Sequence, residues 1–423
     1  MEKYHRKYFG LRKDVAPMLE KTYAARLIDL LRGKGFQIEC DGLTVKLARE
    51  FGFCVGVERA IQMAYETRHK FPDKRIFITS EIIHNGFVNE KLRELGFVFL
   101  TGSEAQATHD DIVSGDVVLI PAFGAPVAEI KRIQKKGALI VDTTCGAVVN
   151  VWKNVQRYAR DGFTSVIHGK YRHEETVATS SRAAGQGDGV TGQDTEHPAH
   201  YIVVRNLEEA RIVCDRIESR GEREVFDQKF APPAVSKDFN PDRDLERIGL
   251  ANQTTMLSNE SLAIQALLRE AFVRKYGEEE TQQRFRSFDT ICSATQDRQD
   301  AVMALLDESP HAMIVIGGYN SSNTTHLAEI GIERNVPTFH IDDAACMLSR
   351  EQIRHQPVGQ KSETTVRNWW PEQKPLTIAV TAGASTPNNK INDVVVRLYE
   401  LNGTDASSLT KAIEALPDES DHH

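Results

Sequence analysis

Ala138-Leu-Ile-Val-Asp-Thr-Thr-Cys145 is the stretch of sequence that decides the fold. Its apolar run predicts a buried strand, and apolar residues at spacings of three and four over Val148–Arg160 predict a helix directly after it. Cys54 ends a strand-like run that begins at Val45, and Cys292 ends Phe288-Asp-Thr-Ile-Cys292. Each of these two cysteines is also followed by a predicted helix, over Val57–Lys70 and Gln299–Leu306. The sequence therefore contains three strand–Cys–helix units.

The similarity between the three units continues downstream. Each unit is followed by a second apolar strand with a polar loop, within 75–85, 164–175 and 312–323. A third strand then ends in small or hydroxyl residues, within 116–124, 248–255 and 376–385. Strands that alternate with helices form parallel sheets, and ligands bind beyond the carboxyl ends of such strands. We predict an α/β fold of three similar α/β domains with mainly parallel sheets, arranged pseudo-threefold around a central cavity.

This repeat sets the predicted domain boundaries. A charged extension over 1–43 precedes the repeat, and a polar tail over 404–423 follows it and is expected to be mobile. The segment Arg354–Pro375 is predicted to be a flexible surface loop. The three domains are predicted at 44–144 with Cys54, 145–290 with Cys145, and 291–403 with Cys292.

Composition narrows the class of protein. The 423 residues are 40% hydrophobic and 26% charged, which is typical of soluble globular proteins. The net charge of −8 argues against nucleic-acid binding. The sequence shows neither a membrane-spanning run nor a signal peptide, so we expect no membrane partner and a cytoplasmic location. A mature chain of the plastid type is also compatible with these features.

The six cysteines are too sparse for a disulfide framework, and no Cys-x-x-Cys pair is present. If the domains surround a common centre, Cys54, Cys145 and Cys292 meet there. A helix N-terminus stabilises a thiolate, and soft sulfur ligands favour an iron–sulfur cluster or zinc. Three cysteines would leave one iron of a cubane open for chemistry. The alternative is that they are three ordinary buried cysteines, since this residue type is commonly buried.

Groups suited to an anionic ligand follow the same predicted strands. They are His84, His173, Ser321, Ser322, Asn323 and Ser385. The residues around Ser321 can equally form a helix N-cap, and both roles are compatible. His173-Glu174-Glu175 is either an exposed polar turn or the source of a carboxyl group that delivers a proton.

The motifs resemble those of the 4-hydroxy-3-methylbut-2-enyl diphosphate reductases, in the same order from about Val45 to Leu401. They are Gly52-Phe-Cys54-Val-Gly-Val-Glu-Arg-Ala60, Glu81-Ile-Ile-His84-Asn85, Asp142-Thr-Thr-Cys145, His173-Glu-Glu175, Asn252-Gln-Thr254-Thr255, Asn320-Ser-Ser-Asn323 and Thr381-Ala-Gly-Ala-Ser385. The resemblance implies three α/β domains around one [4Fe-4S] cluster per subunit. It also implies reductive removal of the substrate's allylic hydroxyl, the last step of the methylerythritol phosphate pathway to isopentenyl and dimethylallyl diphosphate.

The resemblance also implies roles for individual residues. Cys54, Cys145 and Cys292 would hold the cluster, and Glu175 with Thr254 would supply a proton, with His173 close by. The diphosphate would be held by His84, Ser321, Ser322, Asn323 and Ser385, and His173 would also bind the substrate. A ferredoxin or flavodoxin would deliver the electrons, because no Gly-x-Gly-x-x-Gly nucleotide fingerprint stands in a strand–helix context.

Two positions depart from the family pattern. Phe123 stands where many bacterial members have a histidine, and this form is similar to the plant and cyanobacterial branch. Gly146 replaces a proline after Cys145, which is expected to loosen that turn. Two other functions remain open at this stage: a redox-neutral hydro-lyase with the same three-cysteine cluster, and a non-catalytic iron–sulfur sensor.

Overall fold

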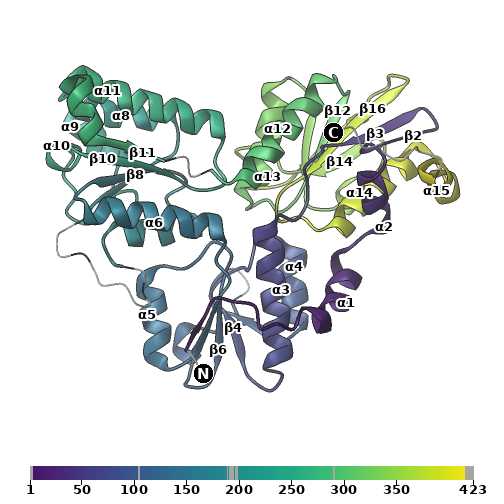
Figure 1. The fold of residues 1–423 in the computed structure, drawn as a ribbon. Coiled ribbons are helices and arrows are strands. Elements are labelled where there is room, and N and C mark those ends of the chain that lie inside the picture. Colours follow the sequence, from purple (N-terminus) through teal and green to yellow (C-terminus); the bar gives the residue numbers. More distant parts are fainter. Residues whose placement is uncertain are drawn as a thin grey trace. The chain divides into compact units, whose positions relative to one another are not determined.

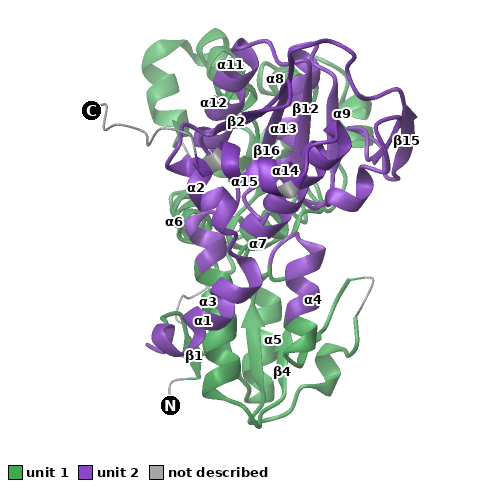
Figure 2. Ribbon diagram, turned by 90° about the vertical axis from the view of Figure 1, so that its right-hand side faces the viewer, with its two compact units in different colours: residues 1–9, 59–82, 92–292 green, residues 10–58, 83–91, 293–423 purple. Residues whose placement is uncertain are grey.

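The structure, a computed structural model, describes residues 3–102, 105–187, 189, 195, 199–288 and 291–414. The chain divides into two compact units, which Figure 2 colours separately. Unit 1 contains residues 1–9, 59–82 and 92–292, and unit 2 contains residues 10–58, 83–91 and 293–423. Among the described residues, no helix combines the length and the hydrophobicity that a bilayer-spanning segment needs.

The first sheet of unit 1 has five strands in the order β1-β7-β6-β4-β5, and all of its pairings are parallel. Its inner strands β4 and β6 are apolar and wholly buried, as expected for a parallel sheet covered on both faces. The strands are β1 (Tyr4–His5), β4 (Ile76–Ile78), β5 (Phe97–Phe99), β6 (Val117–Ile120) and β7 (Leu139–Asp142). The helices in this part of the chain are α3 (Val55–Lys70), α4 (Gly86–Glu94) and α5 (Val127–Lys136), with the 3-10 turn η1 (His109–Asp111).

The second sheet of unit 1 has four parallel strands in the order β11-β10-β8-β9. Figure 1 shows this sheet between α6 on one face and α8 and α11 on the other. The strands are β8 (Thr164–His168), β9 (Tyr201–Val204), β10 (Ile248–Asn252) and β11 (Phe285–Ser287). The helices are α6 (Gly146–Arg160), α7 (Glu174–Ala183), α8 (Leu207–Ile217), α9 (Arg223–Lys229), α10 (Pro241–Asp244) and α11 (Ser258–Arg284).

Unit 2 contains a five-stranded sheet in the order β13-β12-β16-β3-β2, parallel except for the antiparallel β2–β3 pair. A separate antiparallel hairpin joins β14 and β15. The strands are β2 (Gln37–Cys40), β3 (Leu43–Leu47), β12 (Ala312–Ile316), β13 (Thr338–Ile341), β14 (Gln352–His355), β15 (Thr364–Arg367) and β16 (Leu376–Ala382). The helices are α1 (Arg12–Tyr23), α2 (Arg26–Arg32), α12 (Ser293–Asp307), α13 (Ser322–Glu333), α14 (Asn388–Asn402), α15 (Ala406–Glu414) and the 3-10 turn η2 (Ala344–Cys346).

Three mainly parallel sheets confirm the predicted fold class. The strand pairing differs from the predicted domain boundaries, because β3 pairs with β16 in the sheet of unit 2 instead of joining β4 and β6. The extension over 1–43 also enters the sheets, since β1 pairs with β7 and β2 pairs with β3. Unpaired strand edges present hydrogen-bonding groups, and these short segments cover two of them.

Two segments predicted to be mobile are ordered where the structure describes them. Residues 406–414 of the predicted tail form α15, and Leu409 is buried in the core of unit 2; residues 415–423 lie outside the described residues. The predicted loop over 354–375 contains most of the β14–β15 hairpin, and Trp369 and Trp370 are buried in the same core. The apolar surface of these three side chains accounts for the order.

Candidate functional site

Glu175 and Thr254 form a buried pair in unit 1. Glu175 lies in the first turn of α7, and Thr254 follows the carboxyl end of β10. The backbone N of Thr254 donates to Glu175 Oε1 at 2.6 Å, and Thr254 Oγ1 donates to Oε2 at 2.9 Å. Glu175 is only 2% exposed. The structure thus brings together the two residues to which the family resemblance assigns proton delivery.

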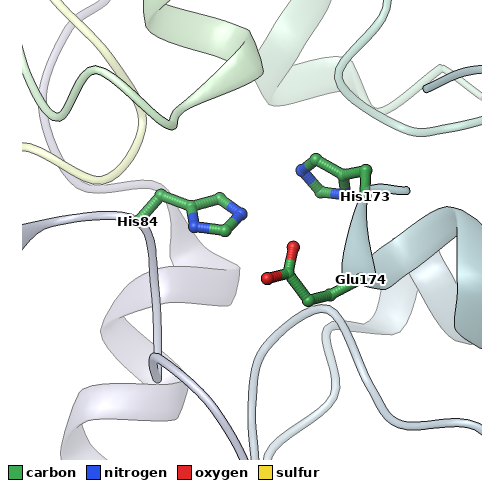
Figure 3. Close-up of side chains that lie close together, drawn as sticks. All are labelled: His84, His173 and Glu174. Carbon is green, nitrogen blue, oxygen red and sulfur yellow. The ribbon is translucent and has the colours of Figure 1, made fainter. Parts of the chain in front are cut away.

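His173 is the N-cap of α7. Its Nδ1 accepts a hydrogen bond from the backbone N of Glu175 at 3.2 Å, so a neutral His173 ring carries its proton on Nε2. Figure 3 shows His173 and Glu174 at the start of α7; His84, also drawn, belongs to a loop of unit 2. Phe123 packs edge-on against the His173 ring, with the ring centroids 6.0 Å apart. Phe123 therefore contacts a predicted site residue through its ring instead of supplying a donor.

Gln253, the residue before Thr254, forms three hydrogen bonds around the start of α7, and its role was not predicted from the sequence. Its Oε1 accepts from the backbone N of Lys170 and from Thr176 Oγ1, both at 3.0 Å, and its Nε2 donates to Thr255 Oγ1 at 2.7 Å. A Cβ at Gly169 would lie 2.9 Å from Thr176 Oγ1. Gln253 thus links the loops after β8 and β10 to α7. Its position inside the Asn252-Gln-Thr254-Thr255 motif is the sequence feature that could have indicated this role.

Cys145 is the N-cap residue of α6 in unit 1 and is half-buried. Its backbone N donates to the carbonyl of Ala122 at 2.8 Å. A Cβ at Gly146 would meet no atom within 4 Å, so the site has room for a side chain there. The expected loosening at Gly146 is opposed by this backbone bond and by the network around Asp142.

Asp142 holds the turn that leads into Cys145. It is 1% exposed, and its carboxylate accepts from Tyr4 Oη at 2.7 Å and pairs with Arg6 Nε at 2.9 Å. The backbone N and Oγ1 of Thr144 also donate to it. Burial and the neighbouring Asp142 charge raise the pKa of Tyr4, so the phenol remains a donor. The N-terminal residues therefore support a predicted cluster ligand.

Cys292 lies beside the Glu175–Thr254 pair within unit 1. Its backbone N donates to the carbonyl of Thr254 at 3.3 Å, and the side chain is half-buried. Cys292 directly precedes α12, which begins at Ser293, earlier than the helix predicted over Gln299–Leu306. Asp289 and Thr290, which form part of its predicted motif, lie outside the described residues.

Cys54 directly precedes α3 and is half-buried, and its backbone N donates to the carbonyl of Ala384 within unit 2 at 3.2 Å. Arg298 holds the same loop, because its Nη2 donates to the carbonyl of Gly52 at 2.7 Å. Arg298 is 3% exposed. No sequence pattern indicated this arginine, since it lies on a helix whose spacing predicts only packing.

The three cysteines fit an iron–sulfur cluster by their chemistry. Each is a half-buried thiol that immediately precedes a helix, whereas Cys214 and Cys346 are buried. Burial raises the pKa of Cys214 to about 12, which makes it a poor ligand. The three cysteines expected to bind a cluster are therefore those whose sulfur is accessible and which lie at a helix N-terminus.

The predicted diphosphate contacts from three distant segments come together in unit 2. Ser385 Oγ donates to the carbonyl of His84 at 3.2 Å, and Asn323 Oδ1 accepts from the backbone N of Ala384 at 2.9 Å. Ser321 caps α13 by accepting from the backbone N of Thr324 at 3.3 Å, so the N-cap interpretation is correct. All five predicted residues of this group are buried: His84, Ser321, Ser322, Asn323 and Ser385.

Asn323 provides the strongest sign of a ligand in unit 2. Its Nδ2 is buried and donates to no group among the residues that the structure describes. A buried donor without a partner costs roughly 1–3 kcal/mol, so such groups commonly serve a bound ligand or water. An anion at the start of α13 would accept this hydrogen bond and face the positive end of the helix dipole.

Comparison with known proteins gives consistent results. A sequence model described as LytB protein matches residues 45–399. A protein of a Synechococcus strain is 48% identical over 95% of this chain and 96% of its own length, and one of Thermosynechococcus vestitus is 46% identical over 95% of each. Both are described as 4-hydroxy-3-methylbut-2-enyl diphosphate reductase.

One solved structure supports the fold. The E-1-hydroxy-2-methyl-but-2-enyl-4-diphosphate reductase from Plasmodium falciparum covers 84% of this chain, and 87% of its own chain is covered. The TM-score is 0.58 at 21% sequence identity. At this level of identity the likeness concerns the chain fold.

Proposed function

Because the chain belongs to the LytB protein family, it is a 4-hydroxy-3-methylbut-2-enyl diphosphate reductase, and we propose that Glu175, Thr254 and three cysteines carry out its reaction. The reaction is the last step of the methylerythritol phosphate pathway. It breaks the allylic C–O bond, forms a C–H bond and releases water, and so consumes two electrons and two protons. The products are isopentenyl and dimethylallyl diphosphate.

Cys54, Cys145 and Cys292 would hold one [4Fe-4S] cluster per subunit. When bound, such a cluster supplies one-electron transfer and an iron with an open coordination position. The support is the half-buried position of each thiol at the start of a helix. The Asp142 network and the Arg298–Gly52 hydrogen bond would keep two of the ligand loops fixed.

The pairing of Glu175 with Thr254 beside Cys292 is the observation that carries this proposal. A hydroxyl leaves more readily as water, so a proton must be held close to it. Glu175 in its acid form would hold that proton, and Thr254 binds both carboxylate oxygens and fixes their direction. His173, which caps the same helix, would offer Nε2–H to the substrate.

The substrate's diphosphate would be held by amide, hydroxyl and imidazole groups. Asn323 Nδ2 is the buried donor that awaits an acceptor, and Ser321, Ser322, Ser385 and His84 lie on the segments that meet around it. None of these five side chains is a carboxylate, so none repels an anion.

A ferredoxin or a flavodoxin would supply the electrons one at a time, in the cytoplasm. The support is that the sequence contains no dinucleotide-binding fingerprint, so a hydride carrier has no evident place in the chain.

The decisive test is Glu175→Gln, assayed without oxygen and with reduced ferredoxin. Gln can still accept from the backbone N of Thr254 but cannot deliver an acid proton, so turnover should fall by roughly 10²–10⁴. Iron and sulfide content should not change. Glu208→Gln, an exposed carboxylate in the first turn of α8, is the matched control and should keep full activity.

Two results would contradict the proposal. Unchanged turnover of Glu175→Gln would remove Glu175 from proton delivery. Turnover of the wild type without any reductant would indicate the redox-neutral hydro-lyase instead.

A further inference from the structure

The segment Gly317–Asn320 connects β12 to the predicted diphosphate loop, and its inner side is closely packed within unit 2. A Cβ at Gly318 would lie 2.5 Å from the carbonyl oxygen of His84, so only glycine allows this approach. At Gly317, φ is 146° and a Cβ would lie 2.6 Å from Thr386 Oγ1. A small shift of this segment would therefore move the backbone that leads into Ser321.

Tyr319 holds the other side of the same segment. Its Oη donates to Glu363 Oε1 at 2.7 Å, and Cys346 Sγ lies 3.8 Å from Tyr319 Oη. The Tyr319 ring packs edge-on against His340, with centroids 5.0 Å apart. His340 Nε2 donates to the carbonyl of Gly317 at 2.9 Å. Tyr319 and His340 thus fix the segment by a ring contact and two hydrogen bonds.

The protonation states of both rings suit these hydrogen bonds. Burial, together with the hydrogen bond to Glu363, raises the pKa of Tyr319, so the phenol stays a donor at neutral pH. Burial lowers the pKa of His340 to about 4, so the ring is neutral. Since a carbonyl oxygen only accepts, the single proton of that ring lies on Nε2.

Glu363 belongs to the β14–β15 hairpin, just before β15. Its second oxygen, Oε2, pairs with Arg354 Nε on β14 at 3.1 Å. The ion pair fixes the carboxylate toward Tyr319 and offsets its negative charge, which would otherwise repel an anionic substrate. The hairpin thus reaches the segment before Ser321 through one defined hydrogen bond.

We propose that the β14–β15 hairpin orients the diphosphate-binding loop through the Tyr319–Glu363 hydrogen bond, which makes both of them positioning residues. The inference rests on the proposed function of Ser321, Ser322 and Asn323. Ser321 is only two positions from Tyr319. The position of Tyr319 therefore sets the position of the Ser321 hydroxyl and of the N-terminus of α13, which would contact the diphosphate.

The test compares Tyr319→Phe with the wild-type holoenzyme. Loss of one hydrogen bond should raise KM for the substrate roughly 3- to 10-fold and leave kcat within about twofold. Inorganic diphosphate, titrated calorimetrically into the holoenzyme, should lose affinity by a similar factor. Iron content and the thermal unfolding midpoint should stay at wild-type values.

Variants of Glu363 make the test specific. Glu363→Ala should match Tyr319→Phe, and the double variant should be no worse than either single one, because one bond is lost in all three. Glu363→Gln keeps an acceptor and should restore most of the affinity. Glu351→Ala, at the other end of the hairpin, is the control and should be neutral.

Two outcomes would overturn the inference: unchanged KM and diphosphate affinity in Tyr319→Phe, or an equal effect in Glu351→Ala. Failure of the proposed function gives a different pattern. In that case the wild type would show no reductive turnover, and diphosphate binding would still be measurable in each variant.

Discussion

The two units use the same kind of parallel sheet but place opposite chemistry beyond its strands. In unit 1 the buried acids are Asp142, at the carboxyl end of β7, and Glu175, in the first turn of α7, and both accept hydrogen bonds through their carboxylate oxygens. In unit 2 the corresponding loops carry hydroxyl and amide groups, such as Ser321, Asn323 and Ser385. Figure 2 shows which segments belong to each unit.

This difference separates two tasks that conflict when they share one surface. A diphosphate needs donors and is repelled by carboxylates, whereas protonation of a leaving hydroxyl needs an acid. Placing the acid Glu175 in unit 1 and the donors around Asn323 in unit 2 resolves the conflict. Variants of Glu175 are therefore expected to change kcat, and variants around Asn323 to change KM.

The cysteines are the exception, because we expect the same loss from either unit. Cys145→Ser in unit 1 and Cys54→Ser in unit 2 should both lose the cluster and reduce turnover to background. Iron and sulfide analysis with electron paramagnetic resonance on anaerobic protein measures this. Cys214→Ser, a buried cysteine of unit 1, should keep its iron. If Cys54→Ser kept the iron and sulfide content of the wild type, the two cysteines would not be equivalent and Cys54 would not be a cluster ligand.

Asn323→Asp should weaken binding of the diphosphate to the loop at the start of α13 in unit 2. The new carboxylate can still accept from the backbone N of Ala384, but it replaces the free donor by a negative charge. We expect kcat/KM to fall roughly 10- to 100-fold, mostly through KM, because a charged contact contributes about 1.5–3 kcal/mol. Steady-state kinetics with reduced ferredoxin measures it. A fall in kcat alone would contradict the assignment of diphosphate binding to the residues around Asn323.

Asp142→Asn tests whether the acids of unit 1 also stabilise its fold. The variant weakens the pairing with Arg6 and Tyr4 inside a buried site, which should cost about 1–3 kcal/mol. Hydrogen exchange of the peptide over 139–145 and the urea midpoint report the loss. Asp110→Asn removes an exposed ion pair with Arg132 and should change neither measurement. Equal effects in both variants would show that Asp142 adds only surface charge.

The smallest effect concerns pH and unit 2. The pKa of His340 is about 4 in the folded protein and about 6.5 when unfolded, so its stabilising contribution is complete above pH 6.5 and is lost toward pH 4. Lowering the pH from 7.5 to 5.5 should therefore cost about 1 kcal/mol. His340→Gln should flatten this slope, as measured by hydrogen exchange of β12 and β13. The same slope in both proteins would exclude His340 as its source.

Much of the fold could be predicted because strand–Cys–helix units encode local structure. Spacing located α3, α6 and α12, and apolar runs located the inner strands. The partner of β3 was not encoded in this way, because alternation along a strand does not specify which distant strand it joins. The β2–β3 hairpin did have a signal: Asp41-Gly42 joins the strands with positive φ at both residues, and Asp-Gly is a common two-residue turn.

The residues of the site also fall into a group that could be predicted and a group that could not. Glu175, Thr254 and Asn323 could be named because each stands in a recognisable sequence motif. Arg298 and Tyr319 could not, since each acts through a hydrogen bond to a segment far away in the sequence. Glu363 was hidden in a polar stretch that is typical of a loop. Positioning residues of this kind need tertiary structure to be recognised.

The pairing of β3 with β16 has a consequence for biosynthesis. Val45 donates its backbone N–H to Tyr399 Oη, a residue 354 positions later, so β3 and its hairpin partner β2 leave the ribosome long before β16 and α14 exist. Until synthesis ends, α1, α2 and β3 must stay exposed or be sheltered by a chaperone. The five-stranded sheet of unit 2 can therefore be completed only after β16 (Leu376–Ala382) has been synthesised.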